Sequence, residues 1–434
     1  MNDVQYRKAT WIASANVYEV NIRQYTKEGT FNAFVAELPR LKDMGVETLW
    51  LMPVTPISQK NKKGSLGSYY ACSDYISVSP EFGTAADLKN LIDRAQAMGF
   101  KVIIDWVANH TGWDHVWTKT NPEYYQADTA TGDFKMASGM EDIIELDFKN
   151  PGLRNAMIDA MQYWVTTFNI DGFRCDLAFW VELDFWKEAR TALEKTKTLL
   201  WLGELDPIDN PDYTEVFDAT YSWTWMHKTA EFYKGTEGLD TLRTVLEKYR
   251  VLCGTGHIPV WFTSNHDENS WNGTEYEKYG DMAKSLAVFA FTWDGMPLIY
   301  SGQELPNTKR LEFFEKDTIA WSGINALHEF YKTLSSLKKN NRALLAGNKK
   351  NSTYLLKNLA DKNCFGYIRA SENDVVLVLL NWSNEKISFQ LTDEVAFGNY
   401  TNVFTGATGS FNSDSIFEMS PWEFLVYEQK TVSV

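Results

Sequence analysis

Four acidic side chains each close a short, largely apolar run of the sequence. Asp105 follows VII, Asp176 follows GFRC, Glu204 follows LLWLG, and Asp267 follows WFTSNH. Any one of them could simply cap a helix that begins after the run. If the runs are parallel strands of one barrel, however, their carboxyl ends meet on one face and bring the four acids together. When several acids lie close together, their pKa values move apart. This suits a site where one acid stays protonated and another stays ionised.

Two carboxyl groups of different ionisation are what the cleavage of a glycosidic bond needs. One protonates the leaving oxygen while the other attacks the anomeric carbon, and a separation of about 5–5.5 Å leads to retention of configuration. Arg174 shares a strand face with Asp176 and would keep it ionised, which makes Asp176 the candidate nucleophile. The apolar residues before Glu204 would raise its pKa toward the role of the acid. Asp267 can bind sugar hydroxyls and stabilise the transition state.

The elements that would position these acids alternate between strand-like and helix-like runs. Helical spacing is clearest at 31–45, 85–99 and 152–170. Strand-like runs lie at 14–22, 46–54, 101–107, 171–176, 198–204, 215–221, 258–265 and 296–302. This alternation predicts an α/β protein with a (β/α)8 TIM barrel, and a doubly wound open sheet is the alternative.

Two segments interrupt the alternation and predict the domain boundaries. Residues 110–146, after the third strand, are rich in turn formers and predict a short insertion over the barrel mouth. Beyond about residue 345 the helical period disappears and short strands follow one another, which predicts a C-terminal all-β sandwich domain over 346–434. The catalytic barrel is then expected over 1–109 and 147–345.

Composition limits the class of partner. The net charge of −15 and the pI near 5.0 disfavour nucleic acid and anionic membrane surfaces, which would repel the chain. The longest apolar stretch is broken by Asp294 before it could span a bilayer, so no membrane partner is expected. The four cysteines are widely spaced and predict neither a zinc site nor a disulfide framework. A neutral ligand fits best, and the 17 Trp and 21 Tyr include rings on which sugars could stack.

Four ordered motifs carry a resemblance to a known family. The stretches DWVANH (105–110), GFRCD (172–176), GE (203–204) and NHD (265–267) resemble the four signature regions of the α-amylase family of glycoside hydrolases, family 13. Supporting stretches at 68–84, 144–150 and 297–304 are similar to further segments of that family. The resemblance covers nearly the whole chain, and it identifies 110–146 as a short version of the family's domain B.

The resemblance implies a role for each matching residue. It implies Asp176 as nucleophile, Glu204 as general acid and base, and Asp267 as the group that stabilises the transition state. Substrate-binding positions are implied around the sugar on the non-reducing side of the scissile bond, with Tyr70 stacking beneath it and Arg174 beside the nucleophile. The remaining residues implied at this subsite are His110 and His266, which would hydrogen-bond the sugar, and Asp105, which would support the pocket.

Departures from the family pattern also carry expectations. Many family members have Lys and His three and four residues after the nucleophile, whereas this chain has Phe179 and Trp180, so we expect the leaving group to be bound by stacking. Asn109 matches a calcium ligand of the family, and Ca²⁺ is therefore the one cofactor that the resemblance suggests. Such an ion takes six to eight oxygens, to which the acidic residues Asp142, Glu145 and Asp147 could contribute. No organic cofactor is expected.

The leading functional hypothesis is a retaining hydrolase that acts on the α-1,4 bonds of starch, glycogen or maltooligosaccharides. Its substrate partner would be an α-glucan. An exo-acting α-glucosidase or a glucosyl-transferring member of the same family is the alternative, and the product distribution over time would distinguish them. A non-catalytic carbohydrate-binding relative is the third hypothesis. Such relatives usually lose part of the catalytic triad, whereas this chain has all three residues.

Overall fold

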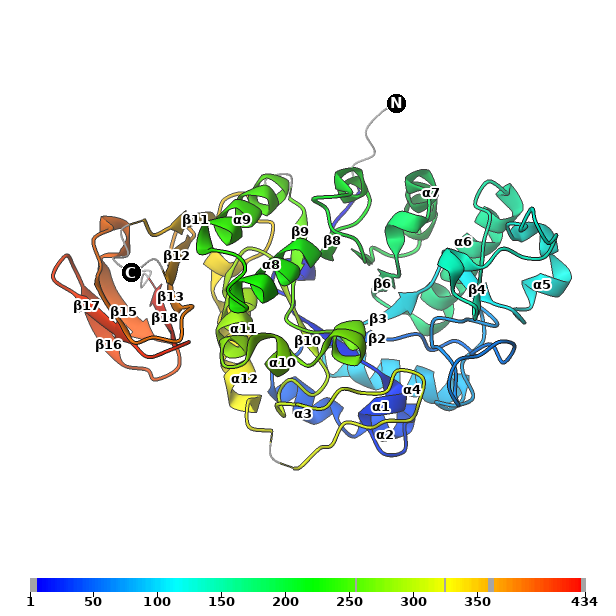
Figure 1. Ribbon diagram of the computed structural model, residues 1–434, viewed down its shortest axis with the longest axis horizontal. Coiled ribbons are helices and arrows are strands. Elements are labelled where there is room, and N and C mark those ends of the chain that lie inside the picture. Colours follow the sequence, from blue (N-terminus) through cyan, green and yellow to red (C-terminus); the bar gives the residue numbers. More distant parts are fainter. Residues whose placement is uncertain (1–5, 254–255, 324, 358–362, 431–434) are drawn as a thin grey trace.

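A closed barrel of eight parallel strands forms the centre of the protein (Figure 1). The computed structural model describes residues 6–253, 256–323, 325–357 and 363–430. The barrel strands are β1 (Val17–Val20), β2 (Thr48–Leu51), β3 (Lys101–Trp106), β6 (Gly172–Cys175), β7 (Leu200–Gly203), β8 (Ala219–Tyr221), β9 (Ile258–Trp261) and β10 (Met296–Tyr300). Because β1 pairs in parallel with both β2 and β10, the sheet has no free edge, and this confirms the predicted TIM barrel over the open sheet.

Helices surround the barrel, and the barrel strands separate two apolar layers. They are α1 (Ile22–Tyr25), α2 (Phe31–Val35), α3 (Leu38–Asp43), α4 (Ala85–Ala97), α6 (Pro151–Phe168), α7 (Leu183–Leu193), α8 (Trp223–Tyr233), α9 (Leu239–Cys253), α10 (Glu275–Tyr279), α11 (Met282–Thr292) and α12 (His328–Asn340). One layer, between strands and helices, contains Cys175 and Trp106. The other fills the barrel interior and contains Trp50 and Tyr221. No helix of the described residues is long and apolar enough to cross a membrane.

Local sequence explains where several helices begin and end. Thr84 and Asp87 form a reciprocal capping box at the start of α4. The Asn150 side chain accepts from two backbone N–H groups of the first turn of α6, and Asn169 ends that helix in the left-handed conformation. The single helix expected over 31–45 is instead broken between α2 and α3. Pro39 lies in the first turn of α3, where its ring would clash with the preceding turn of a continuous helix.

The segment after β3 forms a small excursion at the carboxyl ends of the barrel strands. It contains α5 (Trp117–Thr120) and an antiparallel pair, β4 (His110–Gly112) with β5 (Ile143–Glu145). This unit lies at the right of Figure 1. Backbone hydrogen bonds from Gly112 to Cys72 and from Val116 to Ser73 join it to the loop after β2. Two loops of the barrel therefore combine into one wall beside the strand ends.

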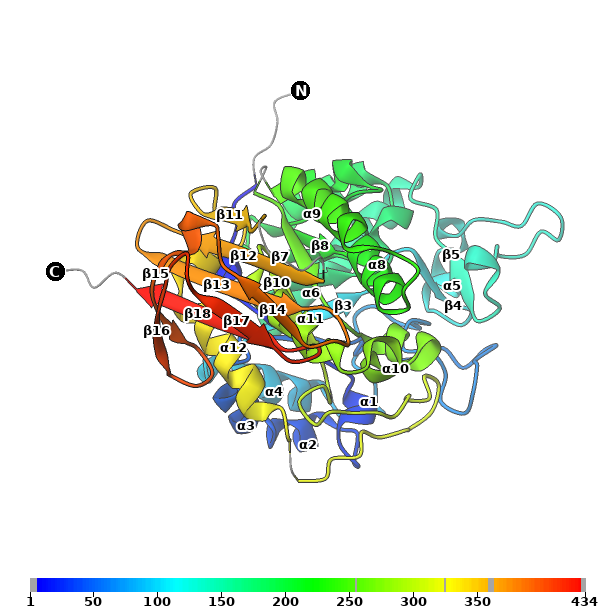
Figure 2. The same ribbon diagram turned by 60° about the vertical axis from the view of Figure 1, so that its left-hand side comes forward.

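The C-terminal strands form an antiparallel sandwich, as expected from the sequence (Figure 2). Six strands pair in the order β11 (Ser352–Leu355), β12 (Cys364–Ala370), β13 (Asp374–Asn381), β18 (Phe424–Lys430), β15 (Gly398–Asn402) and β16 (Thr408–Phe411), and β14 (Ile387–Gln390) pairs with β17 (Ile416–Met419). Trp382 anchors the sandwich to the barrel. Its ring stacks on Phe365 at 4.7 Å, and its indole N–H donates to Ser285 of α11 at 2.8 Å.

Candidate active site

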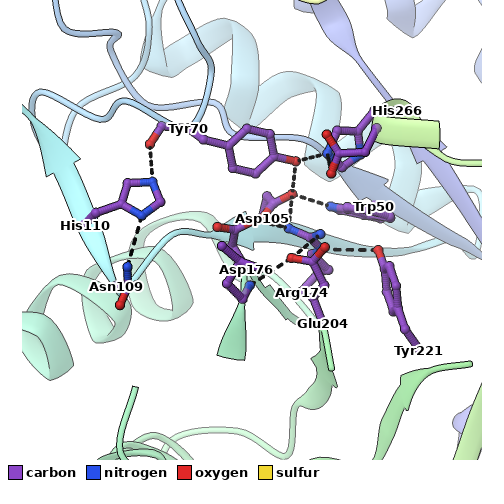
Figure 3. A network of polar contacts seen from close by, with 12 residues as sticks. Trp50, Tyr70, Asp105, Asn109, His110, Arg174, Asp176, Glu204, Tyr221 and His266 are labelled. Atoms are coloured by element: carbon purple, nitrogen blue, oxygen red, sulfur yellow. Dashed lines mark hydrogen bonds and ion pairs between the residues drawn. The ribbon is translucent and has the colours of Figure 1, made fainter. Parts of the chain in front are cut away.

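A single buried guanidinium joins three of the four strand-end acids (Figure 3). The Nη1 atom of Arg174 donates to Asp176 Oδ1 at 2.7 Å and to Asp105 Oδ1 at 3.0 Å. Its Nη2 lies 2.9 Å from Glu204 Oε2, an ion-pair contact without hydrogen-bond geometry. All four side chains are buried. The acids that end β3 and follow β6 and β7 therefore converge as the barrel arrangement predicts.

Strand register places Arg174 inside the barrel. Asp105 and Arg174 are direct neighbours across the β3–β6 pair, and the guanidinium lies 4.8 Å from the centre of the Trp50 ring. The Tyr221 hydroxyl accepts a hydrogen bond from Arg174 Nε at 3.3 Å. Cys175 points the opposite way, into the layer between strands and helices, because side chains alternate along a strand. The arginine is thus fixed by aromatic rings as well as by its ion pairs.

Burial raises the pKa of the two central carboxyl groups to different levels. Burial raises the pKa of Glu204 to about 7, although Arg174 opposes the shift. It raises the pKa of Asp176 to about 6, and here too the Arg174 charge opposes it. At neutral pH Asp176 is therefore mostly ionised while Glu204 is substantially protonated. This is the pairing that a nucleophile and a general acid require.

The turn after β6 orients Glu204. Leu177 adopts a left-handed conformation with φ of 39°, which is uncommon for a side chain of this kind. In this conformation its backbone N–H donates to Glu204 Oε2 at 2.8 Å. The following short turn, Ala178–Trp180, leaves the side chains of Phe179 and Trp180 40% and 36% exposed. Two exposed aromatic side chains therefore follow the residue that holds Glu204, and these are the side chains that the sequence analysis expects to bind the leaving group.

A second chain of hydrogen bonds links His266 to the same network. His266 Nε2 lies 2.8 Å from the Tyr70 hydroxyl, and that hydroxyl donates to Asp105 Oδ2 at 3.0 Å. The Tyr70 and His266 rings are stacked, with centroids 5.3 Å apart. Asp267 lies 3.4 Å from His266 Nε2 and keeps its side chain 40% exposed, so it reaches the open side of the site.

Glu19 completes this chain, and the sequence analysis missed it. Its Oε1 lies 2.5 Å from His266 Nδ1, and the side chain is fully buried within β1. Burial alone would lower the pKa of His266, but the charges of Asp267 and Glu19 outweigh it and raise that pKa to about 9. The imidazole is therefore a cation at neutral pH, with both ring nitrogens donating. Glu19 could have been found as a further acid in a barrel strand.

His110 is linked to the acids through Tyr70, and Asn109 contacts His110. His110 Nε2 is 3.1 Å from the Tyr70 carbonyl oxygen, and Nδ1 accepts from the Asn109 amide at 3.3 Å. Burial lowers the pKa of His110 to about 4, so the ring is neutral. Both ring nitrogens are engaged by protein atoms in this structure. This pair therefore holds the backbone of Tyr70 in place.

The residues near Asn109 do not form an open set of calcium ligands. The Asp142 carboxylate is buried and forms an ion pair with the Lys63 ammonium at 2.8 Å. Glu145 pairs with Lys135 at 2.7 Å, and Asp147 accepts a hydrogen bond from the Lys149 backbone at 3.1 Å. A calcium ion would have to displace these partners to gain its oxygens. Lysine side chains thus already supply positive charge at this position.

Comparison with known proteins agrees with the barrel fold. A family model described as "Alpha amylase, catalytic domain" matches residues 13–134 and 119–343. The chain therefore belongs to the α-amylase family, and the resemblance inferred from its four motifs is confirmed.

Several relatives and solved structures are similar over most of the chain. "Alpha-amylase MalA" of Haloarcula japonica is 26% identical over 95% of this chain, and "Cyclomaltodextrinase" of Geobacillus thermopakistaniensis is 24% identical over 92%. The chain spans 62% and 70% of the lengths of these two relatives. The structure of a noncanonic maltogenic alpha-amylase AmyB from Thermotoga neapolitana has a TM-score of 0.87 and 28% identity, covering 96% of this chain and 99% of that one.

The Glu19–His266 pair predicts how stability depends on pH. Because the pKa of His266 is raised above its ordinary value of 6.5, the pair stabilises the fold fully below that value, and this stability is lost as the pH rises toward about 9. We expect the free energy of unfolding of the wild type to fall across this window. The fall should be roughly 1.4 kcal/mol for each unit by which the pKa of His266 in the folded protein exceeds its value in the unfolded chain. The variant Glu19→Gln should show a much flatter dependence in denaturant titrations at each pH.

The matched control is Glu304→Gln, which removes a buried carboxylate whose partners are Arg40 and Tyr18. This variant should have a lower free energy of unfolding than the wild type but the same dependence of that free energy on pH. Equal slopes for wild type and Glu19→Gln would show that Glu19 does not set the charge of His266.

The Lys63–Asp142 pair predicts insensitivity to chelators. We expect EDTA to leave the Tm and the activity of the wild type unchanged. The variant Lys63→Met should lose about 1–3 kcal/mol of stability, because it leaves a buried carboxylate without its partner. Lys62→Met is the control, since Lys62 is exposed and contacts Gln59. A fall in Tm on adding EDTA that excess calcium reverses would contradict this expectation.

Proposed function

We propose that the protein is a retaining glycoside hydrolase that cleaves α-1,4-glucosidic bonds in starch, glycogen or maltooligosaccharides. The observation that carries the proposal is the shared guanidinium of Arg174, 2.7 Å from Asp176 and 2.9 Å from Glu204. Burial raises the pKa of Glu204 to about 7 and that of Asp176 to about 6 while Arg174 opposes both shifts, so an ionised carboxyl group lies beside one that retains a proton. The names of the relatives, which include alpha-amylases, a cyclomaltodextrinase and a maltogenic alpha-amylase, support the α-glucan as substrate.

In the first step Asp176 attacks the anomeric carbon while Glu204 gives its proton to the glycosidic oxygen. The bond to the leaving sugar breaks as the bond to the Asp176 carboxylate forms. In the second step Glu204, now ionised, takes a proton from water, and that water displaces Asp176. Two inversions at the same carbon return the α configuration. Arg174 stays charged throughout, because the neighbouring carboxylates hold its pKa well above the usual value despite burial.

The surrounding side chains fit the needs of the transition state. Positive charge develops on the sugar ring, and the exposed carboxylate of Asp267 can bind its hydroxyls and stabilise that charge. Tyr70, held by His266 and Asp105, offers a ring face to the same sugar. Asp105 also accepts from the Trp50 indole at 3.2 Å, so its role is to support Arg174 and Tyr70.

A glucosyl-transferring or exo-acting activity is the second candidate, and one observation favours it. Phe179 and Trp180 present apolar faces beside Glu204, where many family members are expected to have polar groups. Such a surface favours a second sugar over water as acceptor in the second step. The non-catalytic hypothesis is the weakest of the three, because the triad is complete and its hydrogen-bond network is intact.

We expect proton NMR of a maltoheptaose digest to show α-anomeric products first, with β-anomers appearing only by later mutarotation. The variants Asp176→Asn and Glu204→Gln should lose at least about 10³-fold in kcat, since each removes a group used in bond cleavage. Asp240→Asn, on the exposed surface of α9, is a control that should keep full activity.

Transferase action would appear in the same spectra as oligosaccharides longer than the substrate at early times. Initial release of β-anomers, or full activity of a folded Asp176→Asn variant, would contradict the retaining mechanism with Asp176 as nucleophile.

A further inference from the structure

The most exposed tryptophan among the described residues, Trp271, lies four positions after Asp267. Trp271 lies in a short π-helical turn, Glu268–Asn272, and is 53% exposed. Single exposed apolar residues are common and need no functional explanation. Trp271 differs because its ring is the most exposed member of a larger group of packed aromatic rings.

Ring contacts connect Trp271 to the catalytic centre. Its centroid lies 5.5 Å from that of Phe313 and 5.8 Å from that of Phe314. Phe313 in turn lies 6.2 Å from Tyr70, with the two rings nearly parallel, and 6.1 Å from His266. We call Trp271, Phe313 and Phe314 the Trp271 platform. It continues a row of packed aromatic rings that begins at Tyr70, and Trp271 is the exposed end of that row.

The backbone around the platform is held by contacts between loops. The Asn269 side chain accepts from the Leu311 N–H at 2.9 Å and donates to the Lys309 carbonyl at 3.2 Å. Leu66 of the loop after β2 donates to the Phe314 carbonyl at 3.3 Å. Lys278 of α10 pairs with Glu268 of the turn at 2.8 Å. The platform is therefore preorganised, and a ligand would not have to order it.

The platform lies on the donor side of the scissile bond. Phe179, Trp180 and the Leu177 N–H that holds Glu204 mark the side where the leaving group departs. Tyr70 and His266 lie away from Glu204, across Asp105 and Arg174 (Figure 3). An α-glucan whose reacting unit covered Tyr70 would then extend, toward its non-reducing end, past the buried Phe313 to the exposed Trp271.

We infer that the Trp271 platform binds the glucosyl unit that precedes the reacting one, by stacking against the apolar face of its ring. This inference rests on the proposed function. Aromatic side chains suit a neutral sugar because they offer area with little loss of side-chain entropy. The platform thus makes the enzyme prefer substrates with at least two units on the donor side.

Two aryl glycosides test the inference. In 4-nitrophenyl α-glucoside only the reacting unit lies on the donor side, whereas 4-nitrophenyl α-maltoside adds the preceding unit. We expect Trp271→Ala to lower kcat/KM for nitrophenol release from the maltoside at least tenfold and to change that from the glucoside less than twofold. Trp271→Phe should recover most of the loss. Chromatography of the released sugars identifies the bond that was cleaved.

Trp180→Ala is the matched contrast, because it removes an exposed tryptophan from the leaving-group side. It should change both substrates by a similar factor, since both carry the same leaving group. Equal effects of Trp271→Ala on the two substrates, or no effect on either, would overturn the inference and leave the proposed function standing. If the wild type cleaves neither glycoside and leaves maltoheptaose intact, the proposed function and the inference both fail.

Discussion

The burial of one guanidinium among three carboxyl groups is the constraint on which the site depends. Arg174 is fully buried, and an isolated charge there would be very costly, so acids must surround it. Burial raises the pKa of Asp176 and Glu204, the neighbouring acids add to the shift, and the single charge of Arg174 opposes it. Barrel closure supplies the acids from three different strands, and the rings of Trp50 and Tyr221 fill the space beside the guanidinium. Burial of Arg174 and its acidic neighbours therefore determines both the packing of the site and its acid–base chemistry.

A second cation extends this arrangement to the sugar-binding side. Glu19 and Asp267 hold His266 in its protonated form, and His266 directs the Tyr70 hydroxyl toward Asp105. The site as a whole contains more acids than bases, with Asp105, Asp176, Glu204, Asp267 and Glu19 against Arg174 and His266. A preorganised excess of negative charge favours a sugar ring that becomes cationic in the transition state. It also favours a protonated Glu204 before the substrate binds.

Much of the fold and the centre of the site could be predicted from the sequence, because both follow from periodicity and from the rule that parallel strands share one carboxyl face. The acids Asp105, Asp176 and Glu204 end strands or follow them directly, so their meeting point was foreseeable. Glu19 is the last but one residue of β1, as Asp105 is of β3, but it lies in none of the four motifs that drew attention to the other acids. The platform of Trp271 and Phe313 depends on loops that approach only after the barrel closes. Pro39 indicated the break between α2 and α3, but the helical spacing of apolar residues on both sides of it favoured the prediction of a single helix.

Trapping of the glycosyl-enzyme tests the central claim most directly. A fluorinated α-glucosyl fluoride whose glycosyl-enzyme forms faster than it hydrolyses should inactivate the protein with a stoichiometry of one. Peptide mass mapping should then find the added sugar on the peptide that contains Asp176, and fragmentation should place it on that carboxylate. A label on Glu204 or Asp267, or no label on an enzyme that still turns over maltooligosaccharides, would contradict the assignment of Asp176 as the nucleophile beside Arg174.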